Sequence, residues 1–145
     1  MTRLIDARTS MGLSTTDLSP DPFPVGDPVL AGQVGLNVPQ STPGIIRIQF
    51  DGVIGAQLGI TSDVTITLTL VNGTLSTDPI VYQSITSYTG SPTSSNNILI
   101  PLSASVYNIP APVSGLLIYS LYVTVSAFIL RSGPESLNAS AYTDN

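Results

Sequence analysis

The side chains able to do chemistry are few in this sequence. Histidine and cysteine are absent, and the acidic residues from position 43 onward are Asp51, Asp63, Asp78, Glu135 and Asp144. Hydrolysis of a glycosidic bond needs two carboxylates that face the bond. Most of these acids stand beside turn residues, where an aspartate usually accepts hydrogen bonds from its own backbone. We therefore expect that the protein is not an enzyme.

Metal and nucleophile chemistry is restricted in the same way. Without imidazole or thiolate side chains the usual zinc sites cannot form, and no serine has a histidine to activate it. A calcium site made by loop carboxylates and carbonyl oxygens stays open, although the sequence has no spaced run of oxygen ligands. We expect no cofactor.

Charged residues are scarce, and lysine is absent. They make up 9% of the chain, against about 25% in ordinary soluble domains. The cations are four scattered arginines, so the clustered positive charge that nucleic acid binding needs is missing. Serine and threonine supply 35 residues. Because so few charges hold copies of this surface apart, we expect the chain to associate with copies of itself.

The first residues lack the apolar core of a secretory signal peptide. Together with the hydroxyl-rich composition, this predicts synthesis in the cytosol and a final place at an exterior surface, such as a spore or a virion. Residues 1–17 show neither helical nor strand periodicity, and we expect a mobile tail there.

Residues 18–42 form a proline-rich segment that we interpret as a connector arm. Four prolines within nine residues exclude helix and central strand and favour an extended conformation. An exposed phenylalanine on a free arm favours docking into a pocket on a neighbouring subunit, which is our interpretation. The alternative is a spacer that packs on its own domain. The predicted docking residues are Pro20, Pro22, Phe23, Pro24, Val25, Gly26 and Pro28.

The most apolar stretch runs from Gly115 to Arg131 and alternates apolar with polar residues. This period of two indicates a long strand with one buried face. At about 15 residues the run is shorter than the ~20 that span a bilayer, so we expect no membrane partner. We interpret it as a central strand or a subunit-interface strand, with Leu117, Tyr119, Leu121, Tyr122, Val123 and Val125 as interface candidates.

The rest of the chain also reads as β-structure. Asp63 to Val71 alternates cleanly, and Asn72-Gly73 is a strong hairpin signal. The three glycines within Asp51 to Gly59 predict a loop or bulged connection. About eight strands separated by turns every 8–12 residues predict an all-β, two-sheet antiparallel jelly-roll sandwich. Its head domain would span residues 43–145, preceded by the extended arm.

Two segments resemble a known family. Pro22-Phe23-Pro24-Val25-Gly26-Asp27-Pro28 resembles the Pro-x-Pro-Val-Gly-Pro-like connector of the F-type endospore appendages of Bacillus and Paenibacillus, apart from the inserted Asp27. Gly115 to Thr143, with its Ser-Gly-Leu-Leu-Ile-Tyr and Ser-Gly-Pro-Glu motifs, resembles the closing strands of that group's head. That head is similar to the tumour-necrosis-factor/C1q-like jelly roll of the exosporium hair glycoprotein.

The resemblance implies a structural subunit of a self-assembling fibre on the spore surface. Trimeric heads would be joined head to tail, each arm docking into the neighbouring subunit by strand complementation. Because the chain has no cysteine, the fibre would be non-covalent. The resemblance leaves room for a spore-coat or exosporium anchor protein and a tip protein as further partners.

Two other interpretations remain open. One is a lectin-like or adhesin binding module that uses the polar loop between Tyr88 and Asn97 and exposed hydroxyl groups. The other is a capsid or fibre protein of a virus or phage.

Overall fold

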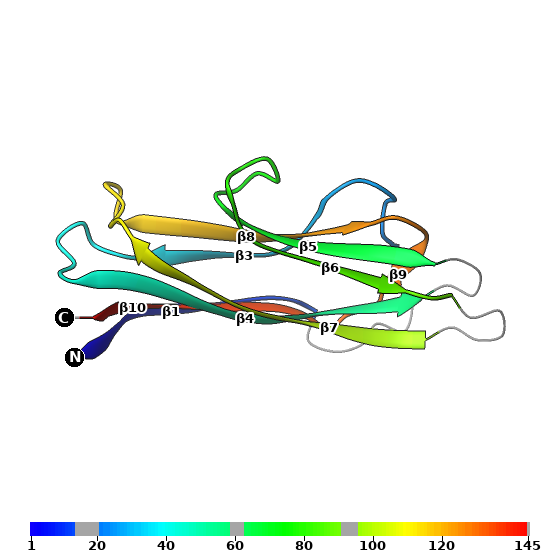
Figure 1. Ribbon diagram of the computed structural model, residues 1–145, viewed down its shortest axis with the longest axis horizontal. Coiled ribbons are helices and arrows are strands. Elements are labelled where there is room, and N and C mark those ends of the chain that lie inside the picture. The colour runs from blue at the N-terminus through cyan, green and yellow to red at the C-terminus, as the bar shows by residue number, and fades with distance from the viewer. Residues whose placement is uncertain (14–20, 59–62, 91–95, 145) are drawn as a thin grey trace.

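A computed structural model describes residues 1–13, 21–58, 63–90 and 96–144 as two antiparallel sheets packed face to face (Figure 1). Sheet A contains β1 (Thr2–Leu13), β2 (Asp21–Pro22), β4 (Ile45–Leu58), β7 (Asn96–Ile109), β9 (Ile129–Arg131) and β10 (Glu135–Asp144). Sheet B contains β3 (Val29–Asn37), β5 (Val64–Asn72), β6 (Ile80–Tyr88) and β8 (Leu116–Val125).

The order of the strands identifies the architecture. Sheet B runs β3-β8-β5-β6. In sheet A, β10 lies between β1 and β4, and β7 pairs with β4. The short β9 continues alongside the end of β4, and β2 pairs with it. The chain therefore changes sheet at nearly every long connection, which is the pattern of a jelly roll. The predicted fold class is confirmed.

The core lies between the two inner faces, where the alternating apolar residues of both sheets meet. In β5, for example, Val64, Ile66 and Leu68 are buried while the threonines between them are more exposed. Across the layers Phe50 of β4 meets Tyr119 of β8 edge to face, with ring centroids 4.8 Å apart. Aromatic pairs favour this geometry because the positive ring edge meets the negative ring face.

Residues 51–58 of the expected loop belong instead to β4, which continues to Leu58, and Gly59 lies outside the described residues. Gly52 and Gly55 do not form a turn but let the backbone of a neighbouring segment come close to β4. A side chain at Gly55 would collide with the backbone of Gly133, and one at Gly52 would collide with the carbonyl of Ser136. Glycine inside a strand often marks such an approach. Strands β5 and β6 pair as the hairpin signal at Asn72-Gly73 predicted, but residues 73–79 connect them and Asn72 is still part of β5.

The predicted division into tail, arm and head is corrected by the structure. Residues 2–13 form β1, which pairs along β10, and residues 29–37 form β3, which pairs along β8. Two of the eight long strands therefore lie before residue 43. The periodicity of β1 is weak because it is an edge strand with mostly exposed side chains, and because its register shifts twice, between Leu4 and Asp6 and between Met11 and Leu13.

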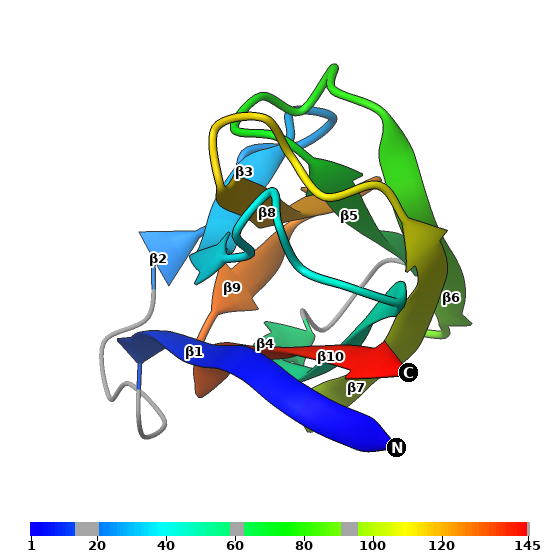
Figure 2. The ribbon, with the colours of Figure 1, turned by 90° about the vertical axis from the view of Figure 1, so that its left-hand side faces the viewer.

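The two flanks of the sandwich differ (Figure 2). On the flank formed by β1 and β3, which we call the closed flank, side chains of β1 bond to the backbone of β3. The Ser10 hydroxyl accepts a hydrogen bond from the Gln33 amide at 3.2 Å, and the Asp6 carboxylate accepts one from the Asn37 amide at 2.8 Å. The opposite flank, where the sheets end in β6 and β7, we call the open flank.

Among the described residues there is no helix long and apolar enough to cross a membrane.

Candidate assembly site

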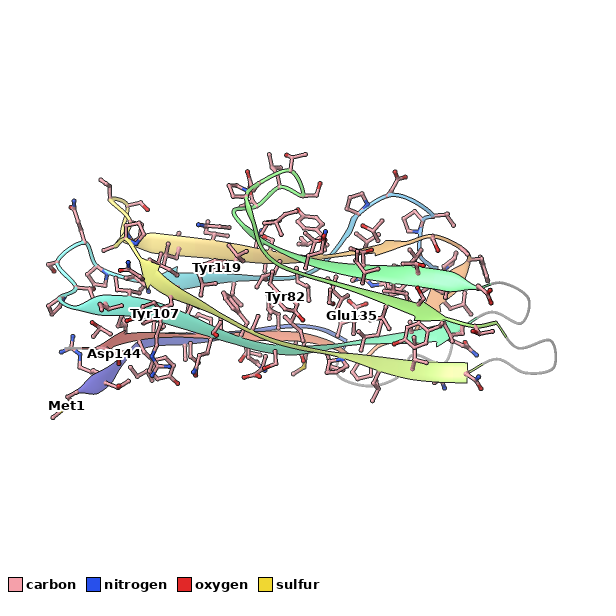
Figure 3. The ribbon with its side chains drawn as sticks, in the orientation of Figure 1. Met1, Tyr82, Tyr107, Tyr119, Glu135 and Asp144 are labelled. Atoms are coloured by element: carbon pink, nitrogen blue, oxygen red, sulfur yellow. The ribbon has the colours of Figure 1, made fainter. Side chains whose placement is uncertain are left out.

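Strand β1 completes sheet A by lying along β10. The two strands are antiparallel, from Thr2 opposite Asp144 to Leu13 opposite Glu135. Their ends, marked by Met1 and Asp144, lie together at one end of the sandwich (Figure 3). Most described side chains of β1 are exposed, and among its hydrophobic ones Ile5 packs against the core. Backbone pairing therefore holds β1 more than hydrophobic burial does.

Two carboxylates help to hold β1 in place, Asp6 against β3 and Asp144 against β10. Asp6 accepts hydrogen bonds from the Asn37 amide and from the Arg8 guanidinium, at 2.8 and 3.0 Å. Burial alone would raise the pKa of Asp6, but these bonds outweigh it and lower the pKa from 3.8. A hydrogen bond from the Thr2 hydroxyl, aided by the charge of Arg47, lowers the pKa of Asp144 in the same way. Both carboxylates favour the docked strand when they are ionised.

Acid should therefore loosen β1 before it loosens the core. A carboxylate whose folded-state pKa is depressed stabilises the fold above its unfolded pKa, near 3.8 here, and this stability is lost as the pH falls through the folded pKa. Between about pH 5 and about pH 3, hydrogen-exchange protection factors in β1 should fall while those in β8 hold. The double variant Asp6→Asn, Asp144→Asn should abolish this difference. Equal loss of protection in β1 and β8 would contradict the expectation.

The predicted docking arm lies on its own domain. Phe23 is 2% exposed and belongs to the core cluster, and its amide donates to the carbonyl of Ile129 at 3.0 Å. The prediction that Phe23 fills a pocket on a neighbour is therefore wrong for this structure. The local sequence shows that an apolar side chain needs burial, but it does not show whether its own domain or a neighbouring subunit buries it.

The remaining arm residues cross from sheet A to sheet B. Pro22 pairs with Leu130 in the short β2–β9 ladder. Val25 bridges to Val125 and stays 55% exposed, while Gly26, at a φ of +82°, donates its amide to the Val125 carbonyl. Pro24 and Pro28 are exposed, and Pro20 lies outside the described residues. The extended conformation that the prolines predicted is present from Asp21 to Val25, and the chain turns at Gly26 and Asp27 before it enters β3.

A buried ion pair anchors the arm, and the sequence analysis missed it. Glu135, at the start of β10, is fully buried and receives two hydrogen bonds from the Arg131 guanidinium, at 2.5 and 2.6 Å. The Glu135 carboxylate raises the pKa of Arg131, against the effect of its partial burial. The guanidinium also lies 6.0 Å from the Phe23 ring centre and reaches the Leu30 carbonyl at 3.4 Å. The cluster thus joins the arm, β3 and β10. In the sequence, the sign of this pair was an arginine and a glutamate four residues apart in a region with few other charges.

The predicted interface strand is β8, and its apolar face is used inside the domain. Strand β8 lies between β3 and β5 at the centre of sheet B. The five interface candidates on its inner face are at most 6% exposed, namely Leu117, Tyr119, Leu121, Val123 and Val125. They leave no surface for a neighbour, so the central-strand interpretation is right and the interface interpretation is wrong. The sixth candidate, Tyr122, is half-buried on the outer face and donates its hydroxyl to the Thr74 carbonyl at 2.5 Å.

The outer face of sheet A carries a shallow polar depression of about 350 Å³ between β4 and β7. Gln49, Asp51, Ser103 and Ser105 contribute its polar side chains. With one carboxylate in this lining, the two-carboxylate chemistry of glycosidases has no basis there. Within residues 1–13, 21–58, 63–90 and 96–144, no group of three acidic side chains lies close enough to hold a metal ion.

Comparison with known proteins adds a distant structural likeness. No family model and no curated protein matches the sequence. Among solved structures, the chain is similar to one titled "Structure of infectious bursal disease virus Gx strain", with a TM-score of 0.47 and 12% identity. The match covers 98% of this chain and 36% of that one, so this chain spans about a third of the viral chain's length. The jelly-roll assignment above rests on the strand order.

Proposed function

We propose that the protein is a structural subunit of a non-covalent fibre on the spore surface, built from copies of this chain. The observation that carries the proposal is β1, an edge strand near the start of the sequence. It is held on β10 mainly by backbone pairing and contributes little to the core. The joint between subunits is therefore assigned to residues 2–13 instead of residues 20–28, whose Phe23 remains in its own core.

Assembly follows from exchange of this strand. When β1 of one copy lies on β10 of the next, the same contacts that β1 makes within its own chain are formed between the two molecules. The exchange therefore costs little contact energy. Strand addition supplies the backbone hydrogen bonds of the joint. Because the donor strand and the acceptor edge are different surfaces, the contact does not close on itself, and it propagates a filament. Heads grouped in threes, as the family resemblance implies, would join through several strands at once and gain avidity.

Cysteine cross-linking tests the exchange in a chain that has no cysteine of its own. Thr9 and Asn138 are exposed register partners on β1 and β10. Fibres of the variant Thr9→Cys, Asn138→Cys, oxidised after assembly, should give a ladder of covalent multimers on non-reducing gels. The same variant, oxidised as a monomer before assembly, should form no fibres under the electron microscope until reductant is added.

The single variants Thr9→Cys and Asn138→Cys are the controls, and each should assemble with or without oxidant. If oxidised fibres run only as monomers, β1 stays on its own β10 and the joint lies elsewhere. If the unaltered protein forms no fibres at any concentration, the fibre proposal fails. Immunogold labelling of intact spores tests the spore-surface location, and absence of label would remove it.

A further inference from the structure

The open flank has two free strand edges. Strand β6 pairs with β5 alone and β7 pairs with β4 alone among the described strands, so the outer backbone groups of both face the same side of the sandwich (Figure 2). Edges of this kind are templates for pairing with another chain. On the closed flank the edge of β3 is different, because its Gln33 and Asn37 amides already donate hydrogen bonds to side chains of β1.

The two strands of the open flank, β6 and β7, contain no charged residue. No charged residue occurs between Pro79 and Leu130, a segment that includes all of β6, β7 and β8. Soluble proteins commonly place lysine or other charges on exposed edges to prevent edge-to-edge pairing. The two edge strands therefore present no charged side chain of their own. The nearest acids lie at the ends of β6, where Asp78 stands two residues before the strand and Asp63 accepts a hydrogen bond from the Gly90 amide just after it.

Apolar side chains are exposed on these two strands. Ile80 and Ile85 of β6, and Leu99 and Tyr107 of β7, are each more than half exposed. Tyr82 and Tyr88 of β6 pack against the core but remain only partly covered. A second apolar surface placed against the flank would remove this area from water, which favours association.

Strand β6 is the less protected of the two edges. Strand β7 carries Pro101 near its middle, and proline cannot donate a backbone hydrogen bond. The nine residues of β6 contain neither proline, glycine nor a charged side chain. Antiparallel pairing of β6 with its own copy is self-complementary, so one surface serves both partners of a two-fold pair.

We propose that the edge of β6 binds the edge of β6 in a second copy of this chain, so that sheet B continues from one molecule into the other. The inference rests on the proposed function in that it supplies a second contact for the same assembly. It uses the flank opposite to β1, so the two contacts do not compete (Figure 2). In a fibre joined by β1, this contact pairs heads side by side.

A lysine on the edge tests the proposal. Ile85 lies on the outer face of β6, opposite Thr67, and is 65% exposed. Ile85→Lys places a positive charge on each of the two paired edges, and we expect the particle mass measured by light scattering to halve. The measurement uses the full chain carrying the oxidised Thr9–Asn138 cross-link, in which exchange of β1 is blocked. Thr67→Lys adds the same charge to the same face one strand away from the edge, and its mass should stay unchanged.

The outcomes separate this proposal from the fibre proposal. If Ile85→Lys leaves the mass unchanged while its thermal unfolding matches that of the parent, the β6 contact does not exist. Equal dissociation by Thr67→Lys would mean that the outer face, not the edge, makes the contact. Ile85→Lys without the cross-link should still form fibres, and these should be separate rather than paired. If β6 pairing is lost while fibres still form, the β6 contact is the one affected. If fibres are lost while β6 pairing remains, the β1 joint is the one affected.

Discussion

Replacing Phe23 by alanine should lower the free energy of unfolding by about 3–5 kcal/mol. The side chain is buried in the core of its own domain, so its removal leaves a cavity as well as lost contacts. A loss of this size is a large part of the 5–15 kcal/mol that stabilises a typical domain. The expected fall in melting temperature is on the order of 10 °C, measured by calorimetry or circular dichroism.

Val25→Ala is the matched control for Phe23→Ala. Val25 lies two residues away on the same arm and is mostly exposed, so its truncation should change stability by less than about 1 kcal/mol. The pair of variants also distinguishes a docked arm from a free one. If the arm left its own domain, as the sequence predicted, Phe23→Ala would leave the stability of the monomer unchanged.

Replacing Arg131 by methionine should destabilise the protein by about 3 kcal/mol, the lower end of the range for a broken buried ion pair. Glu135 would remain fully buried with its charge uncompensated, while Arg131 itself is about one-third exposed, which reduces the effect. Denaturant unfolding at neutral pH measures the change. The slope of the transition should stay the same because the fold is kept.

The double variant Arg131→Met, Glu135→Met tests the origin of that loss. Replacing both members of a buried pair by apolar residues is often neutral, so the double variant should recover most of the stability lost by Arg131→Met alone. A double variant as unstable as the single one would show that the Arg131 contacts to Phe23 and Leu30, not the stranded carboxylate, cause the loss.

Regular alternation made much of the fold predictable. In β5 and β8 the apolar residues take every second position, and these strands appear where they were expected, with that face buried. Strand β1 was missed because an edge strand exposed on most sides carries little of this signal and because its register shifts twice. Glycine was misread at residues 51–59, since a turn and a close backbone approach both favour it.

The assembly surfaces were harder to predict for a different reason. The pattern around Phe23 and that of β8 both show that apolar side chains are buried, and the structure buries both within one chain. Whether a neighbour or the chain itself supplies the burial depends on how distant segments meet. Arg131 and Glu135 illustrate the same point, because their importance comes from Phe23 and Leu30, residues about a hundred positions away in the sequence.

The position of the arginines has a consequence for digestion. Trypsin cleaves after arginine or lysine, and here the targets are Arg3, Arg8, Arg47 and Arg131. Arg47 lies in β4 and is paired with Asp144, and Arg131 is bound to Glu135, whereas Arg3 and Arg8 lie on the edge strand. Residues 48–130 offer no target even when unfolded. Trypsin should therefore trim β1 while the rest of the sandwich stays intact, and an assembled joint that covers β1 should shield Arg3 and Arg8 from the enzyme.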